Sequence, residues 1–163
     1  WKNYDAANGD YTGACLPFGL SRSVNSPYPI QIVQHSKYVA LLFEQSTWFH
    51  VVPVDGRGHR KQDPTWFGDS VGHWEGDTLV VDTAGLNDKV WMDGNAPQTE
   101  KAHIVERYRR TDRGHLDLEI TVDDPGSLTH PWKVHRILTL APKEEVLEYI
   151  CNENQKSDHY VGR

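Results

Sequence analysis

The sequence is short of cysteine and has no long hydrophobic run, and each shortage excludes a class of protein. Only two of its 163 residues are cysteines, Cys15 and Cys151. No Cys-x-x-Cys pair and no Cys/His pair with zinc spacing occurs, which argues against a thiolate metal site. No apolar stretch approaches the roughly 20 residues that cross a bilayer, so we predict no membrane span.

An uncompensated basic surface is also missing. The formal net charge is −6, and the densest basic stretch, residues 107–110, is followed by Asp112, Asp117 and Glu119. Proteins that bind a phosphate backbone need a positive surface, so we expect no nucleic-acid partner. The apolar share of 37% and the charged share of 25% are typical of one globular domain.

The two cysteines allow two interpretations, namely independent buried thiols or one disulfide. We favour the disulfide, because closing so long a loop contributes about 4–5 kcal/mol in the chain-entropy model. A disulfide indicates an oxidising compartment. The chain also opens at Trp1 without a signal peptide, as a processed product would. We therefore expect a secreted or periplasmic protein.

The pattern of the remaining residues predicts an all-β fold. Short β-prone runs recur about every 8–12 residues, the spacing of a sandwich or barrel, and no segment keeps a helical period. We expect residues 1–28, rich in Gly, Asn, Ser and Pro, to be an irregular segment packed on the domain. Residues 29–163 are predicted to form an antiparallel meander that closes as a barrel. The predicted strands cover residues 30–35, 38–44, 47–54, 70–75, 78–84, 102–110, 115–122, 132–140 and 145–152.

A glycine fixes the register of one predicted hairpin. Gly76 takes the first central position of a two-residue type II′ turn. This turn sets Trp74 beside Leu79 on an apolar face. It also leaves a gap at Gly72, where another side chain or a ligand can approach closely.

A second hairpin turns at residues 112–114, with glycine at the left-handed position of a three-residue loop. Side chains on one face recur every second residue, and a slip by one residue would lose every charge pair. The predicted cross-strand pairs are Arg109–Asp117, Arg107–Glu119 and His103–Asp123 on one face, and Tyr108–Leu118, Glu106–Ile120 and Ile104–Val122 on the other.

Glu106 is the first candidate catalytic residue, because this register puts it on the apolar face between Ile104 and Tyr108. A carboxylate there must be paired, be protonated or face a cavity, since burying a bare charge is costly. We interpret it as a general acid or base with a raised pKa in the barrel interior. A structural partner for a buried arginine or a tyrosine hydroxyl is the alternative.

His103, opposite Asp123, is the second candidate. A carboxylate orients an imidazole and raises its basicity, although a ladder of opposed charges is more often a solvated outer face. Glu106 and His103 lie on opposite faces of one strand, so both cannot line one lumen without a bulge. The sequence leaves open which face lines the cavity, and at most one of the two sites is expected to be catalytic.

Two long loops, residues 55–68 and 86–101, mix aromatic with charged residues and are predicted to fold over a ligand. Lys89 in the second loop is a candidate electrostatic clamp. The candidate ligand-binding residues are His59, Trp66 and Trp91 from these loops, with Trp132 from a predicted strand.

We expect no cofactor. A metal site built from His59, His73 and His103 with a carboxylate is conceivable, since imidazole suits zinc and copper, but no local His spacing supports it. Residues 68–72 match the Gly-x-Ser-x-Gly pattern of a serine nucleophile. That motif needs a strand before it and a helix after it, whereas here a loop precedes it and a hairpin follows.

One block of sequence is more specific. Residues 64–66, 68–70 and 74–83 spell Pro-Thr-Trp, Gly-Asp-Ser and Trp-Glu-Gly-Asp-Thr-Leu-Val-Val-Asp-Thr. The block resembles a family of secreted proteins of unknown function from environmental bacteria, whose members carry export signals. The resemblance covers most of the chain from Cys15 onward and implies export, but no particular chemistry. The hairpin pattern also resembles lipocalin-like barrels, a fold-level analogy that carries no function.

We predict an exported enzyme that acts on a small organic molecule by acid–base chemistry, of lyase or isomerase type. A non-catalytic protein that binds a small apolar or sugar-like ligand is the first alternative, and a protein-interaction module is the second. The enzyme predicts a cavity with perturbed titratable groups, the binding protein predicts an aromatic cavity without them, and the interaction module predicts no cavity. The sequence names no substrate and no oligomeric state.

Overall fold

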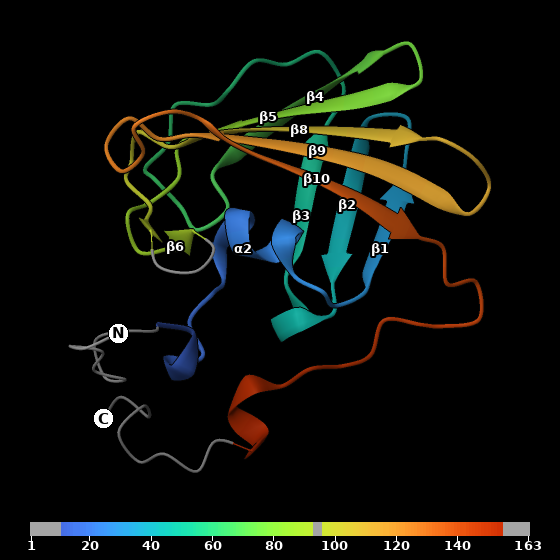
Figure 1. Ribbon diagram of the computed structural model, residues 1–163, viewed down its shortest axis with the longest axis horizontal. Helices are drawn as coiled ribbons and strands as arrows, with labels where there is room; N and C mark the ends of the chain where they lie inside the picture. The colour runs from blue at the N-terminus through green and yellow to red at the C-terminus, as the bar shows by residue number, and fades with distance from the viewer. Residues whose placement is uncertain (1–10, 93–95, 155–163) are drawn as a thin grey trace.

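The computed structural model describes residues 11–92 and 96–154, which are built mainly of antiparallel β-sheet (Figure 1). A five-stranded sheet has the order β10-β9-β8-β5-β4, and a three-stranded sheet has the order β1-β2-β3. The strands of the larger sheet are β4 (Asp69–Glu75), β5 (Thr78–Ala84), β8 (His103–Arg110), β9 (His115–Asp123) and β10 (Trp132–Thr139). Those of the smaller sheet are β1 (Ile30–Gln34), β2 (Tyr38–Phe43) and β3 (Phe49–Pro53).

The two sheets and the helix α2 (Gly19–Asn25) enclose one hydrophobic core. In β8 every second side chain from Ile104 to Tyr108 is buried, and the residues between them are half-exposed. This period of two places one face of the larger sheet against the core and the other toward solvent. In Figure 1 the strands of the smaller sheet cross those of β8–β10 steeply, and α2 lies beside them.

The all-β antiparallel prediction is confirmed, but within the described ranges neither sheet closes on itself. The predicted barrel closure is therefore not observed. The two sheets separate between β3 and β4, where no backbone ladder joins the described strands. A side-chain contact bridges this corner instead, with His50 Nε2 and Ser70 Oγ 2.6 Å apart.

Part of the segment predicted to be irregular is helical. The 3₁₀ turn η1 (Tyr11–Ala14) precedes α2, whose Leu20 and Val24 are one helical turn apart and fully buried. Packing of this apolar edge stabilises a helix that is too short to be stable alone. Arg136 on β10 donates to the carbonyl of Asn25 at the C-terminal end of α2, where a cation is favourable.

Both predicted hairpin registers are confirmed. Trp74 pairs with Leu79 across the Gly76 turn, and His103 pairs in register with Asp123 on β9. The gap at Gly72 is filled by the smaller sheet, because a Cβ at that position would lie 2.8 Å from Val52 Cγ1. The close approach predicted there is therefore made by a side chain.

The Cys15–Cys151 disulfide is confirmed, with the two Cα atoms 5.6 Å apart and 136 positions apart in sequence. The last predicted strand is wrong: residues 145–150 form no ladder, and the 3₁₀ helix η4 (Cys151–Asn154) follows them. Side chains hold this segment instead. Glu44 accepts from the backbone N–H of Leu147, and Thr47 donates to the carbonyl of Tyr149.

Three short elements complete the fold. The 3₁₀ helix η2 (Gln45–Thr47) joins β2 to β3, and β6 (Trp91–Met92) pairs with β7 (Ala96–Pro97) inside the second long loop. None of the helices in the described residues is long and apolar enough to cross a membrane.

Candidate functional site

Glu106 lies at the centre of the inner face of the larger sheet. Its Cα partners are Val81 on β5 and Ile120 on β9, and its own side chain is 0% exposed. Tyr108, two residues along the same face, donates its hydroxyl to Glu106 Oε1 at 2.5 Å. The sheet therefore surrounds a single carboxyl group with apolar side chains and one phenol.

Burial raises the pKa of Glu106 to about 7, and the hydrogen bond from Tyr108 only partly opposes this rise. The second carboxyl oxygen, Oε2, has no hydrogen-bond partner in the part of the chain that the structure describes. Burial and the neighbouring carboxyl raise the pKa of Tyr108 well above its ordinary value. Burial thus shifts Glu106 toward its neutral form, beside a phenol that keeps its proton.

A cavity of about 150 Å³ lies next to this pair, between the two sheets. The smaller sheet lines it with Ile32, Gln34, Val39 and Leu41. The larger sheet lines it with Trp74, Asp77, Leu79, Tyr108, Arg110 and Leu116. Tyr108 belongs to the wall of the cavity and Glu106 does not.

The lining of the cavity includes apolar side chains that are partly exposed to solvent. Ile32 and Trp74 are 41% and 46% exposed, which is unusual for large side chains on the core-facing side of two packed sheets. Asp77 and Arg110 add one charge of each sign. The cavity therefore combines an apolar interior with polar groups.

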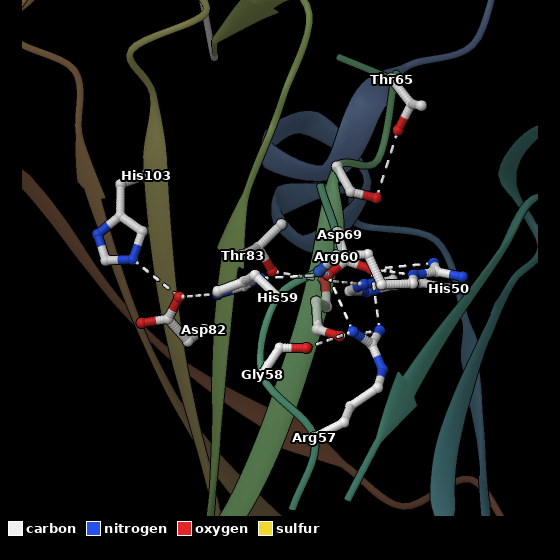
Figure 2. A network of polar contacts seen from close by, with 12 residues as sticks. His50, Arg57, Gly58, His59, Arg60, Thr65, Asp69, Asp82, Thr83 and His103 are labelled. Carbon is white, nitrogen blue, oxygen red and sulfur yellow. Dashed lines mark hydrogen bonds and ion pairs between the residues drawn. The ribbon is translucent and has the colours of Figure 1, made fainter. Parts of the chain in front are cut away.

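A second polar cluster lies on the opposite face of the larger sheet (Figure 2). Asp82 Oδ1 receives two imidazoles, with His59 Nε2 at 2.8 Å and His103 Nε2 at 3.0 Å. All three side chains are more than a third exposed. Burial tends to raise the pKa of Asp82, but the hydrogen bonds from His103 and His59 outweigh burial and leave that pKa below its ordinary value.

The neighbouring carboxylate, Asp69, holds the first long loop on the sheet. Arg57 Nη1 and Nη2 donate to its two oxygens at 3.0 and 2.9 Å, and Arg60 contributes a backbone N–H at 2.8 Å and its Nε at 2.9 Å. Burial would raise the pKa of Asp69, but these donors and the charge of Arg57 hold it well below its usual range. Asp69 is only 3% exposed, and both of its carboxylate oxygens accept hydrogen bonds from the two arginines. It therefore forms a structural ion pair.

A buried chain of polar groups runs through the corner between the sheets. His50 Nε2 contacts Ser70 Oγ, and Ser70 Oγ lies 2.7 Å from Thr83 Oγ1. Burial lowers the pKa of His50 to about 4, so its imidazole is neutral at pH 7. Ser70 lies inside β4 and is 4% exposed, not on the strand-to-helix turn of a serine nucleophile.

The pairing predicted for His103 needs correction. Asp123 is opposite His103 in register, but the hydrogen bond of His103 goes to Asp82 on the other neighbouring strand. His73, on the neighbouring strand β4, contacts Glu75 at 3.1 Å. Within the described ranges, no group of three or more His, Cys, Asp or Glu side chains is arranged to hold a metal ion.

The remaining predicted site residues lie apart from the cavity. Lys89 is exposed in the second long loop, and Trp91 is half-buried in β6. The Trp66 ring lies 5.9 Å from the Tyr11 ring, and Trp132 packs against the core from β10. None of these four side chains lines the cavity.

Sequence reasoning missed Trp74, Tyr108 and Arg110 as cavity residues. The signal was partial, because one hairpin register places Trp74 beside Leu79 and the other places Tyr108 and Arg110 on the face of Leu118. What the registers lacked was the Leu79–Tyr108 pairing of β5 with β8, which joins the hairpins.

Comparison of the chain with protein-family models, with curated proteins and with solved structures found no match.

Proposed function

We propose that this chain is an exported enzyme that acts on a small organic molecule by acid–base chemistry, of lyase or isomerase type. The observation that carries the proposal is Glu106, a fully buried carboxyl group without a cationic partner in the described residues, one side chain away from a cavity. Such a group is costly to bury. A carboxyl group with a shifted pKa next to a cavity is typical of an active site.

The chemistry follows from the hydrogen bond between Tyr108 and Glu106. As a substrate C–H proton moves to Tyr108 Oη, the proton of Tyr108 moves to Glu106 Oε1, and the pair stores one proton. An isomerisation returns this proton to another atom of the same molecule, so it needs no oxidant and no second substrate. A group whose pKa is about 7 is suited to both directions at neutral pH.

The cavity supports a small, mainly apolar substrate. Apolar cavities of its volume hold a molecule about the size of benzene. The Cys15–Cys151 disulfide supports the export part of the proposal, because such bonds persist in oxidising compartments.

A test without a known substrate uses hydrogen exchange. Acetophenone, phenylacetone and cyclohexanone are incubated with the protein in D₂O, and loss of the C–H signal next to the carbonyl is followed by proton NMR. The wild type should accelerate exchange, with a rate that rises as pH passes about 7, because the ionised Glu106 is the base. Glu106→Gln should slow the exchange by about 10²- to 10⁴-fold.

The matched control is Glu119→Gln, which changes an exposed glutamate on the neighbouring strand β9. It should leave the exchange rate unchanged. If Glu106→Gln exchanges as fast as the wild type while near-ultraviolet circular dichroism shows an intact fold, Glu106 is not the base.

A non-catalytic binding protein is the second candidate, and one observation favours it: Glu106 itself does not line the cavity. In that case Tyr108 and Trp74 contact the ligand, and Glu106 only orients the phenol. The binding protein predicts chemical-shift changes at Trp74 with all three ketones and no catalysed exchange with any of them.

A further inference from the structure

We propose that the cavity takes a small organic carboxylate, whose compact apolar body lies against Trp74 and Tyr108 and whose carboxylate binds Arg110. This inference rests on the proposed function, because it names the class of molecule that the acid–base site receives. It is carried by Arg110, a cation that lines the cavity and lacks an anionic partner among the described residues.

Arg110 differs from the other arginines of β8. Arg107 contacts Glu75 at 2.7 Å, and Arg109 contacts Asp117 at 3.7 Å. For Arg110, no carboxylate oxygen of residues 11–92 or 96–154 makes such an ion pair. Arg107 and Arg109, which have carboxylate partners, do not line the cavity. Arg110, which has none in the described residues, does line it.

The guanidinium of Arg110 is nevertheless held in place. Its Nε donates to the carbonyl of Asp112 and its Nη2 to the carbonyl of Arg113, both at 3.0 Å. Carbonyl oxygens orient the group without neutralising its charge. A preorganised guanidinium with a remaining N–H edge is suited to a carboxylate, which it binds with two parallel hydrogen bonds.

The dimensions of the site fit one such molecule. Tyr108 and Arg110 are alternate residues of β8, so their Cα atoms are about 7 Å apart. A body the size of a benzene ring fills the cavity, and a carboxylate on that body reaches Arg110 while the ring contacts Tyr108. The exposed indole of Trp74 offers an aromatic surface for the same ring.

Asp77 is the one acidic side chain of the lining, and its effect on binding tests whether the ligand is an anion or a cation. It forms no ion pair with Arg110 in the described structure, so its charge acts on the ligand as well. An anionic ligand is repelled by Asp77 and attracted by Arg110, whereas a cationic ligand would respond in the opposite way.

The experiment compares three probes of nearly equal size, namely benzoate, benzamide and benzylammonium, by NMR titration at low ionic strength. Benzoate should bind roughly ten- to a hundredfold more tightly than benzamide, as expected for a hydrogen-bonded charge pair. Arg110→Gln should remove this preference, Arg110→Lys should keep part of it, and Asp77→Asn should tighten benzoate. Arg109→Gln is the matched control, because Arg109 pairs with Asp117 away from the cavity.

Two results would overturn the ligand class: benzamide or benzylammonium binding at least as tightly as benzoate, or Arg110→Gln leaving the preference intact. If Arg110→Gln does not fold, the order of the three probes on the wild type and on Asp77→Asn decides. Glu106→Gln separates the two proposals. Benzoate selectivity retained in Glu106→Gln, without ketone exchange in the wild type, supports the carboxylate site and refutes the acid–base chemistry. Catalysed exchange without benzoate selectivity refutes the carboxylate site alone.

Discussion

Two buried titratable groups should make opposite contributions to the pH dependence of stability. Burial raises the pKa of Glu106 from 4.5 to about 7 and lowers that of His50 from 6.5 to about 4. Neither side chain has an ion-pair partner in the described residues, so each shift reflects loss of hydration. Each gap of about 2.5 pH units corresponds to about 3–4 kcal/mol, at about 1.4 kcal/mol per unit.

The two signs follow from which state binds the proton more tightly. Between pH 4.5 and 7 the folded state keeps the proton of Glu106 and the unfolded state has lost it, so the free energy of unfolding falls as pH rises. Between pH 4 and 6.5 the unfolded state binds a proton at His50 and the folded state does not, so the free energy of unfolding rises with pH. From these two groups the wild type should therefore show almost no net pH dependence between about pH 4.5 and 6.5.

Single substitutions should reveal the two pH dependences of the free energy of unfolding that cancel in the wild type. Relative to the wild type, the free energy of unfolding of Glu106→Gln should rise by about 3–4 kcal/mol from pH 4.5 to 7, and that of His50→Gln should fall by about 3–4 kcal/mol from pH 4 to 6.5. Both amides can still bond the hydroxyls of Tyr108 and Ser70 respectively. Urea unfolding at closely spaced pH values, with the disulfide intact, measures all three curves. Parallel curves for the wild type and Glu106→Gln would falsify the raised pKa, and carbon-13 NMR titration of the Glu106 carboxyl checks it directly.

Three further changes test the framework around the site. Asp69→Asn should lower the free energy of unfolding by about 3 kcal/mol in urea titrations, because it leaves Arg57 without a buried partner; a loss below 1 kcal/mol contradicts this. Reduction, or Ala at both Cys15 and Cys151, should cost up to about 5 kcal/mol, measured as the shift of the urea midpoint with and without reductant. Gly72→Ala should cost about 1–3 kcal/mol in thermal unfolding, since its Cβ would lie within 3 Å of a methyl group of Val52, and an unchanged midpoint argues against that close contact.

The hairpin registers were predictable because local chemistry determines them. Gly76 has the positive φ that its turn was predicted to need, whereas Gly114 does not have the predicted left-handed conformation, although its hairpin still pairs in the predicted register. Of the three predicted charge pairs of the second hairpin, only Arg109–Asp117 forms an ion pair. Once the register was set, strand alternation placed Glu106 on the buried face. These inferences need only residues that are close together in sequence.

The partner of His103 was not predictable in the same way. Asp123 is its neighbour across a short turn, whereas Asp82 belongs to a strand that precedes the long loop of residues 86–101. The choice between the two carboxylates depends on β5 pairing with β8, and a long loop carries no register signal. The same limit explains why the sequence suggested Trp66 and Trp91 for ligand binding, while Trp74 lines the cavity.

The last predicted strand is wrong, and barrel closure is not observed in the described residues, for a related reason. Alternation in residues 145–152 resembles a strand, but an edge strand forms only where a partner offers free backbone groups. In the structure this segment is tied down by Glu44, by Thr47 and by the disulfide. At the corner between β3 and β4, a histidine–serine contact takes the place of a ladder.

Asp69 and Glu106 are two buried carboxyl groups that the fold treats in opposite ways. Asp69 is 3% exposed and receives two arginines, whose donors and charges hold its pKa well below the usual range. Glu106 is 0% exposed and receives one phenol, and its pKa rises to about 7. A buried carboxylate that serves only stability is paired with cations, or it receives several hydrogen-bond donors, as Asp124 does from Thr99 and Gly126. Asp69 fits the first description and Glu106 fits neither, and Glu106 is also the one that adjoins the cavity through Tyr108. This difference supports the proposal that Glu106 has a chemical role, whereas Asp69 stabilises the fold.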